Sequence, residues 1–281
     1  MRKSFIFPPI CLLLDRRLNT IFRTSIKSTP LRAACFQGSL PIVKFLASRG
    51  ADFNIANQYD NTCLMIAGYK GYTDIVNFLL SAGAKPDVAA RCGASVLHFS
   101  AEGGHTAVVS ALASHGATLT RNEAGFSALV TAAERCQSDA VDLILRLWSE
   151  DISREEKIDA LELLGASFAN DKESYNAKKA YEYLLLGMEE RWRDPENPIR
   201  KEPMAPVEAY GNWLECETVE QVKSRLKSDL GALYMEGLTI RERLLGANFI
   251  DIPRSVIYRG AVYADASRFD RCVPLWLHAL R

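Results

Sequence analysis

The chain has 281 residues, 48% hydrophobic and 24% charged, which is enough for about two ordinary globular domains. Its 34 basic and 34 acidic residues leave no net charge, which excludes a global field that would recruit nucleic acid or an anionic membrane. No run approaches the roughly eighteen apolar residues of a membrane span. Seven scattered cysteines without a CxxC pair indicate free thiols in a reducing compartment, the cytoplasm or the nucleus.

Residues 1–27 differ from the rest of the chain, because six basic residues and a single acid surround a short apolar run. Two interpretations stay open. Basic flanks around a short apolar run are the signature of a targeting peptide. However, Pro8 and Pro9 interrupt the run and no small-residue cleavage site follows. This favours a disordered leader that replaces earlier repeats and leaves the first recognisable repeat without its N-terminal cover.

Between residues 28 and 150, one pattern of about 33 residues recurs four times. Its openings lie 33, 33 and 32 residues apart and begin with a hydroxyl residue, at Thr29, Thr62, Ser95 and Ser127. Each opening leads through a turn into an apolar run. Three of the four repeats then end in Gly-Ala, at Gly50, Gly83 and Gly116.

This period and wording resemble the ankyrin repeat, a turn followed by two antiparallel helices. The Thr or Ser of each opening is suited to cap the first helix. The glycine of the Gly-Ala end is suited to the left-handed conformation that closes the second helix. One such repeat cannot bury its own apolar face, so the sequence predicts an all-α solenoid in which the stack is the folding unit.

A second helical domain is expected over residues 155–281, after the period of 33 ends. Helices are predicted over 154–169, 176–192, 219–245, 255–264 and 269–280, with a loop over 201–213. Residues 160–168 with 177–188, and 258–265 with 269–279, resemble tetratricopeptide hairpins. In each, a small residue lies where the two helices touch and Tyr or Trp fills the space beside it. Since the chain ends inside the second hairpin, we expect this domain to be truncated.

A search for catalytic motifs finds little. The sequence has no Gly-rich phosphate loop, HExxH or GxSxG, and its four histidines have no metal-ligand spacing. We therefore expect no metal, no cofactor and no enzymatic activity. His105 and His115 occupy common structural positions of the repeat. Cys92 falls on a predicted turn tip, where it is either a plain exposed thiol or a reactive or ligand-binding one.

Binding is the better-supported role, because exposed positions of the inner helices and the turn tips line the concave surface of such a solenoid. The candidate peptide-binding residues are Arg32, Phe36, Gln37, Tyr69, Lys70, Cys92, His98 and Glu102. Met65 is expected at the same surface. Basic and aromatic side chains on one concavity resemble a peptide groove in which Arg32 or Lys70 binds a carboxylate.

The sequence resembles the Fem (feminization) protein homologues in four segments, residues 29–36, 61–67, 158–166 and 258–265. The resemblance covers residues 28–280. Residues 92–94 and 165–171 are most similar to the B member of the vertebrate set. The resemblance implies a non-catalytic substrate receptor of a cullin-RING ubiquitin ligase. Such receptors hold the C-terminal tail of a target, often ending in arginine, in the ankyrin concavity. They contact elongin B/C and cullin-2 through a box near their own C-terminus.

Three departures modify that expectation. The family reads Cys-Phe-Asp-Gly where this chain has Gln37 in place of the acid. Residues 1–27 stand where the family has earlier repeats, and the cullin-contacting region is absent. We therefore expect weak or altered tail binding and no cullin recruitment by this chain alone. The alternative is an ankyrin-repeat scaffold for a folded partner, unrelated to ubiquitin.

Overall fold

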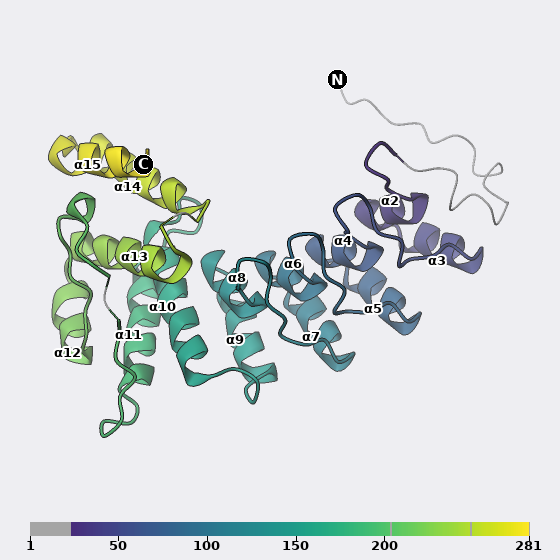
Figure 1. Cartoon of the computed structure of the whole chain (residues 1–281), viewed down its shortest axis with the longest axis horizontal. Helices are drawn as coiled ribbons and strands as arrows, with labels where there is room; N and C mark the ends of the chain where they lie inside the picture. The colour runs from purple at the N-terminus through teal and green to yellow at the C-terminus, as the bar shows by residue number, and fades with distance from the viewer. Residues whose placement is uncertain (1–23, 203, 248, 281) are drawn as a thin grey trace. The chain divides into compact units, whose positions relative to one another are not determined.

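The computed structural model describes residues 24–202, 204–247 and 249–280, so the leader expected over residues 1–27 lies outside them except for its last four residues (Figure 1). The chain divides into two compact units, Met1–Ala128 (unit 1) and Leu129–Arg281 (unit 2). This division falls inside the predicted repeat region, and the predicted domain boundaries remain a prediction. Among the described residues, no helix combines the length and the hydropathy that crossing a membrane requires.

In the part of unit 1 that the structure describes, the short helices α2 to α7 form three successive pairs (Figure 1). They are α2 (Pro30–Gln37), α3 (Leu40–Ser48), α4 (Cys63–Tyr69), α5 (Thr73–Ser81), α6 (Val96–Glu102) and α7 (Thr106–Ser114). The first helices of the pairs pack on one another in the order α2, α4, α6, and the second helices in the order α3, α5, α7. The result is the two-layered helical stack that the period of 33 predicts.

The repeat openings act as helix caps in the first two repeats. Thr29 accepts a hydrogen bond from the backbone N–H of Arg32 at 3.2 Å, and Thr62 accepts one from Met65 at 3.3 Å. Both bonds satisfy an N–H that has no partner inside its helix. The three Gly-Ala ends have the predicted left-handed conformation, with φ of +82°, +94° and +75° at Gly50, Gly83 and Gly116.

Unit 2 contains the remaining helices. They are α8 (Ala128–Glu134, whose first residue belongs to unit 1), α9 (Ser138–Leu147), α10 (Arg154–Asn170), α11 (Ala177–Arg191), α12 (Val219–Gln221), α13 (Leu230–Leu245), α14 (Ile252–Asp265) and α15 (Phe269–Ala279). A short 3-10 helix, η2 (Glu208–Tyr210), lies within the predicted loop, and a π-helical turn, η3 (Val222–Leu226), follows α12. Helices α10 and α11 pair, α14 and α15 pair, and α13 packs on α10.

The single helix predicted over residues 219–245 is wrong, because the chain breaks before α13. Asp229 begins a new helix there, and its side chain accepts a hydrogen bond from the backbone N–H of Ala232 at 3.1 Å. An Asp at this position competes with helix continuation and favours a new start, which the apolar periodicity alone did not reveal.

Small residues bring the paired helices of unit 2 close together. A Cβ added at Gly165 of α10 would lie 2.8 Å from the carbonyl oxygen of Ala180 in α11. Gly260 of α14 lies against the indole of Trp276 in α15, whose Nε1 donates to the carbonyl of Ile257 at 3.2 Å. The second hairpin therefore has the predicted packing of a small residue against an aromatic ring, whereas Gly165 of the first hairpin lies against Ala180 and Leu184 and not against Tyr or Trp. Their kinship to tetratricopeptide repeats stays a prediction.

Candidate functional site

The candidate site in unit 1 is a pocket, here named the repeat pocket, formed across three successive repeats. Its volume is about 230 Å³, and it is lined by Arg32, Asn61, Met65, Ile66, Tyr69 and Phe99. These side chains come from α2, from α4 and the residue two positions before it, and from α6. Because α2, α4 and α6 pack side by side, residues more than sixty positions apart meet in one pocket.

The repeat pocket contains one buried donor and one buried acceptor without a protein partner. Arg32 Nε and Asn61 Oδ1 are both buried, and neither has a hydrogen bond within the described part of the chain. A terminal nitrogen of the same guanidinium is hydrogen-bonded, since Arg32 Nη1 donates to Ser28 Oγ at 3.2 Å. Burial lowers the pKa of Arg32. A buried polar group without a partner costs about 1–3 kcal/mol, so a ligand that supplies both partners would bind favourably here.

A group of aromatic side chains and one lysine ammonium group lie beside the repeat pocket. Lys70 Nζ lies 4.8 Å from the ring centroid of Phe36 and 5.6 Å from that of Tyr69. Tyr69 in turn meets Phe99 edge-on, with the centroids 6.4 Å apart. Phe36 and Tyr69 remain 47% and 46% exposed, which is high for rings of this size. Exposed aromatic surface next to a cation is typical of peptide-binding sites.

The expected exposure of His98 is wrong, because its side chain is only 2% exposed. His98 Nδ1 lies 3.1 Å from the backbone N of Ser95, and Nε2 lies 3.0 Å from the carbonyl oxygen of Phe126. Since the Ser95 N–H can only donate, Nδ1 accepts and the ring proton is on Nε2, which donates to Phe126. Burial lowers the pKa of His98 and favours this neutral form. Met65, also expected at the surface, is buried against its own helix cap.

Of the predicted binding residues, the structure brings four together: Arg32, Phe36, Tyr69 and Lys70. Gln37 is exposed at the end of α2, Glu102 is half-buried at the end of α6, and Cys92 is exposed on its turn as expected. None of these three lines the repeat pocket. The grouping supports a smaller site than the sequence suggested, confined to the first helices of the first three repeats.

Three residues of the repeat pocket were missed in the sequence. Ile66 and Phe99 lie one repeat apart at the same position, immediately after Met65 and His98. The period itself therefore contained the signal, because the predicted exposed face was set one residue too early along the helix. Asn61 precedes a cap residue in a loop, and nothing in its local pattern distinguishes it from other polar loop residues.

Comparison with known proteins agrees with this architecture. A family model for ankyrin repeats in three copies matches residues 10–90 and 64–156, together more than half of the chain. The chain is similar to the fem-1 homologue C of Xenopus laevis, at 39% identity over 157 residues, which cover 56% of this chain and 25% of that protein. A fem-1 homologue of Drosophila melanogaster is 39% identical over 164 residues, covering 58% and 24% of the two chains.

A third relative, the fem-1 homologue A of Danio rerio, is 37% identical over 166 residues, which cover 58% of this chain and 26% of that protein. The chain thus spans about a quarter of the length of these curated relatives. These matches support the resemblance at the level of fem-1 homologues. The finer likeness to the B member stays a prediction.

Proposed function

Because the chain belongs to the ankyrin-repeat family and resembles the fem-1 homologues over more than half of its length, we propose that it is a substrate receptor of a cullin-RING ubiquitin ligase. In this proposal the chain performs no chemistry itself. It binds the C-terminal tail of a target protein and thereby raises the target's local concentration beside the ubiquitin-loaded enzyme. Its further partners would be elongin B/C and cullin-2, in the cytoplasm or the nucleus.

The observation that supports this proposal is the pair of unsatisfied groups in the repeat pocket. Arg32 Nε is a donor and Asn61 Oδ1 an acceptor, both buried and without a partner in the described chain. The end of a peptide supplies the complement of both, with a carboxylate or carbonyl oxygen for the guanidinium and a main-chain N–H for the amide. The ammonium group of Lys70 adds positive charge beside the pocket and favours a terminal carboxylate over a capped one.

The same charges predict which tails bind poorly. Arg32 and Lys70 repel an arginine at the end of a tail, and Gln37 is an exposed neutral amide where the fem-1 family has an acid. Because residue 37 is exposed, an acid there would contribute only about 0–1 kcal/mol to such a charge pair. We therefore expect arginine-ended tails to bind more weakly than tails with neutral or acidic last residues.

Peptide binding to the purified chain tests this proposal. Fluorescence anisotropy would compare peptide pools that differ only in a free or an amidated C-terminus. We expect selective binding of the free carboxylate, weakened about tenfold or more by Arg32→Ala. Arg49→Ala is the matched control, because Arg49 is exposed in the same unit and its guanidinium lies 5.2 Å from the ring of Phe45. Far-UV circular dichroism verifies that each variant is folded.

Other outcomes would favour the scaffold alternative. Equal binding of free and amidated peptides, or an unchanged peptide affinity in Arg32→Ala, would mean that the repeat pocket does not recognise a terminal carboxylate. Gln37→Asp should improve binding of arginine-ended over lysine-ended tails, and no gain would exclude residue 37 from the site. Affinity capture with the complete gene product tests the ligase itself. Capture of neither elongin nor cullin-2 would contradict the receptor role and leave an ankyrin scaffold.

A further inference from the structure

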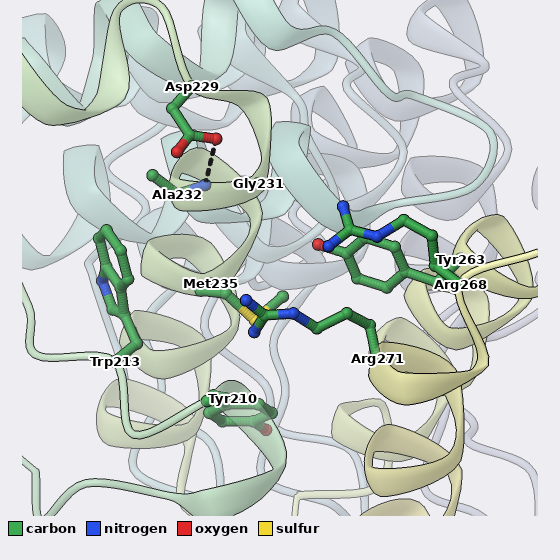
Figure 2. Close-up of a pocket in the computed structure, with 10 residues that line it drawn as sticks. Tyr210, Trp213, Asp229, Gly231, Ala232, Met235, Tyr263, Arg268 and Arg271 are labelled. Atoms are coloured by element: carbon green, nitrogen blue, oxygen red, sulfur yellow. Dashed lines mark hydrogen bonds between the residues drawn. The ribbon is translucent and has the colours of Figure 1, made fainter. Parts of the chain in front are cut away.

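Unit 2 contains a second pocket, here named the arginine pocket, which the proposed function does not use (Figure 2). It lies among residues 210–213, the beginning of α13 and the beginning of α15, and has a volume of about 230 Å³. It is lined by Tyr210, Gly211, Trp213, Asp229, Gly231, Ala232, Met235, Tyr263, Arg268 and Arg271. All of these residues belong to unit 2.

Two arginines extend into the arginine pocket from the start of α15 (Figure 2). The guanidinium of Arg268 lies 5.3 Å from the ring centroid of Tyr263. Arg271 Nη1 occupies the space beside Gly211, where an added Cβ would lie only 2.6 Å from it. Gly211 also has a φ of +69°, so a glycine here permits both the turn and the approach of the guanidinium. Burial raises the pKa of Tyr263, while nearby arginines, Arg271 and Arg268 among them, act to lower it.

Within the described residues, neither guanidinium has a hydrogen bond or an ion pair, so neither is paired with an acid. The hydrogen bonds that Arg268 and Arg271 make are those of their backbones. Asp229 is the one acid among the residues that line the pocket, and its carboxylate caps α13 through the N–H of Ala232. The pocket therefore has an excess of positive charge, with two planar five-donor groups available to an anion.

The remaining walls are aromatic or apolar and held in place. Trp213 Nε1 donates to Glu236 Oε2 at 2.7 Å, and the guanidinium of Arg225 stacks 4.2 Å from the Trp213 ring centroid. Met235 and Tyr263 are buried. The volume of about 230 Å³ is smaller than the roughly 300–1,000 Å³ of a site for a drug-sized ligand or cofactor, so it suits one inserted side chain.

We propose that the arginine pocket binds an aryl phosphate, the phosphotyrosine side chain of a partner protein. Arginine forks bind phosphate oxygens two at a time, and two exposed guanidinium groups without a partner in the described chain are available for this in the arginine pocket. The aromatic and thioether walls match the ring that carries the phosphate. The site depends on no residue of the repeat pocket, so it stands or fails separately from the proposed tail binding.

Nuclear magnetic resonance of the full chain tests this assignment with phenyl phosphate as the probe. The indole N–H signal of Trp213 reports on the pocket wall, and inorganic phosphate and benzoate provide the comparison anions. We expect a saturable shift of the Trp213 signal, with phenyl phosphate bound about tenfold tighter than either comparison anion. Arg271→Ala and Arg268→Ala should each weaken phenyl phosphate about tenfold, the effect of one lost charged hydrogen-bond donor.

The matched control is Arg254→Ala, because Arg254 is an exposed arginine of α14 that pairs with Glu173 outside the pocket. It should leave the affinity unchanged. No saturable shift at millimolar phenyl phosphate, an affinity no tighter than that for inorganic phosphate, or equal losses in Arg254→Ala and Arg271→Ala would each overturn the proposal. Tighter binding of a single-stranded oligonucleotide than of a phosphotyrosine peptide, abolished by Arg271→Ala, would overturn it in favour of nucleic acid.

Discussion

Unit 2 encloses an ionic cluster whose stability should depend on one lysine. The ammonium of Lys201 is 2% exposed and lies 3.2 Å from Glu215, 3.5 Å from Glu162 and 3.5 Å from Glu236, whose side chains are each 1% exposed. Burial by itself lowers the pKa of Lys201, but the three carboxylates outweigh it and the net pKa is raised. Lys201 is therefore charged at neutral pH and compensates buried negative charge.

Replacing Lys201 by Met keeps most of the side-chain volume and removes the charge. Among the described residues, the three buried carboxylates would then keep only Arg191 and Arg243 as cationic partners, which bond Glu162 at 2.7 and 2.8 Å. Breaking a buried ionic cluster by removing one partner costs about 3–5 kcal/mol, because an uncompensated charge is left behind. In a unit of about 150 residues, this corresponds to a fall of the thermal midpoint on the order of 10 °C.

Intrinsic tryptophan fluorescence measures this unfolding selectively, because all four tryptophans lie in unit 2, at Trp148, Trp192, Trp213 and Trp276. The control is Lys178→Met, which removes an exposed ammonium 3.8 Å from Glu182 on the surface of α11. Such a pair contributes about 0.3–0.5 kcal/mol. If Lys201→Met and Lys178→Met destabilise unit 2 equally, the cluster is not the electrostatic core inferred here. Adding Glu236→Gln to Lys201→Met should recover part of the loss.

Two further substitutions test structural assignments. His98→Ala should cost unit 1 about 1–3 kcal/mol in urea unfolding followed by circular dichroism, because the buried N–H of Ser95 loses its acceptor. Since the pKa of His98 is lowered in the folded state, the wild type should lose stability as pH falls below about 6.5, and the variant should lack this loss. Gly165→Ala should cost about 1–3 kcal/mol, because its Cβ meets the carbonyl of Ala180. Wild-type stability of either variant would contradict its assignment.

The period of 33 made the helical repeats of unit 1 predictable because each cap and each turn is local. Thr29 and Thr62 cap helices within three residues of themselves, and Gly83 ends one within its own turn. Interactions of this kind depend on neighbouring residues, so the residue types and their spacing are sufficient evidence for them.

The ionic cluster was not predictable in the same way. Glu162, Lys201 and Glu236 lie on α10, on the loop before η2 and on α13, and nothing in the local pattern around any of them separates a buried charge from a solvated one. The break before α13 was missed for a related reason, since Asp229 acts as a cap only once tertiary packing decides where the helix begins.

The third residue of the first helix in each repeat explains why the tail-binding proposal depends on Arg32. Met65 and His98 are the third residues of their helices and lie one repeat apart. In each case the side chain turns back and accepts a hydrogen bond from the backbone N–H of its own cap residue, through Met65 Sδ at 3.4 Å and His98 Nδ1 at 3.1 Å. These side chains therefore make their hydrogen bonds inside the fold and are not available to a ligand.

Arg32 occupies the corresponding position one repeat earlier, three residues after Thr29. A guanidinium has donors only, so it cannot accept the N–H of its cap residue as Met65 and His98 do. Its Nη1 donates instead to Ser28, and its Nε stays buried without a partner in the described chain. The first repeat thus lacks half of a capping box and keeps a half-buried cation whose Nε is buried without a partner in the described chain, which is unfavourable for folding alone. A bound carboxylate would offset this cost, which is why the tail-binding test centres on Arg32.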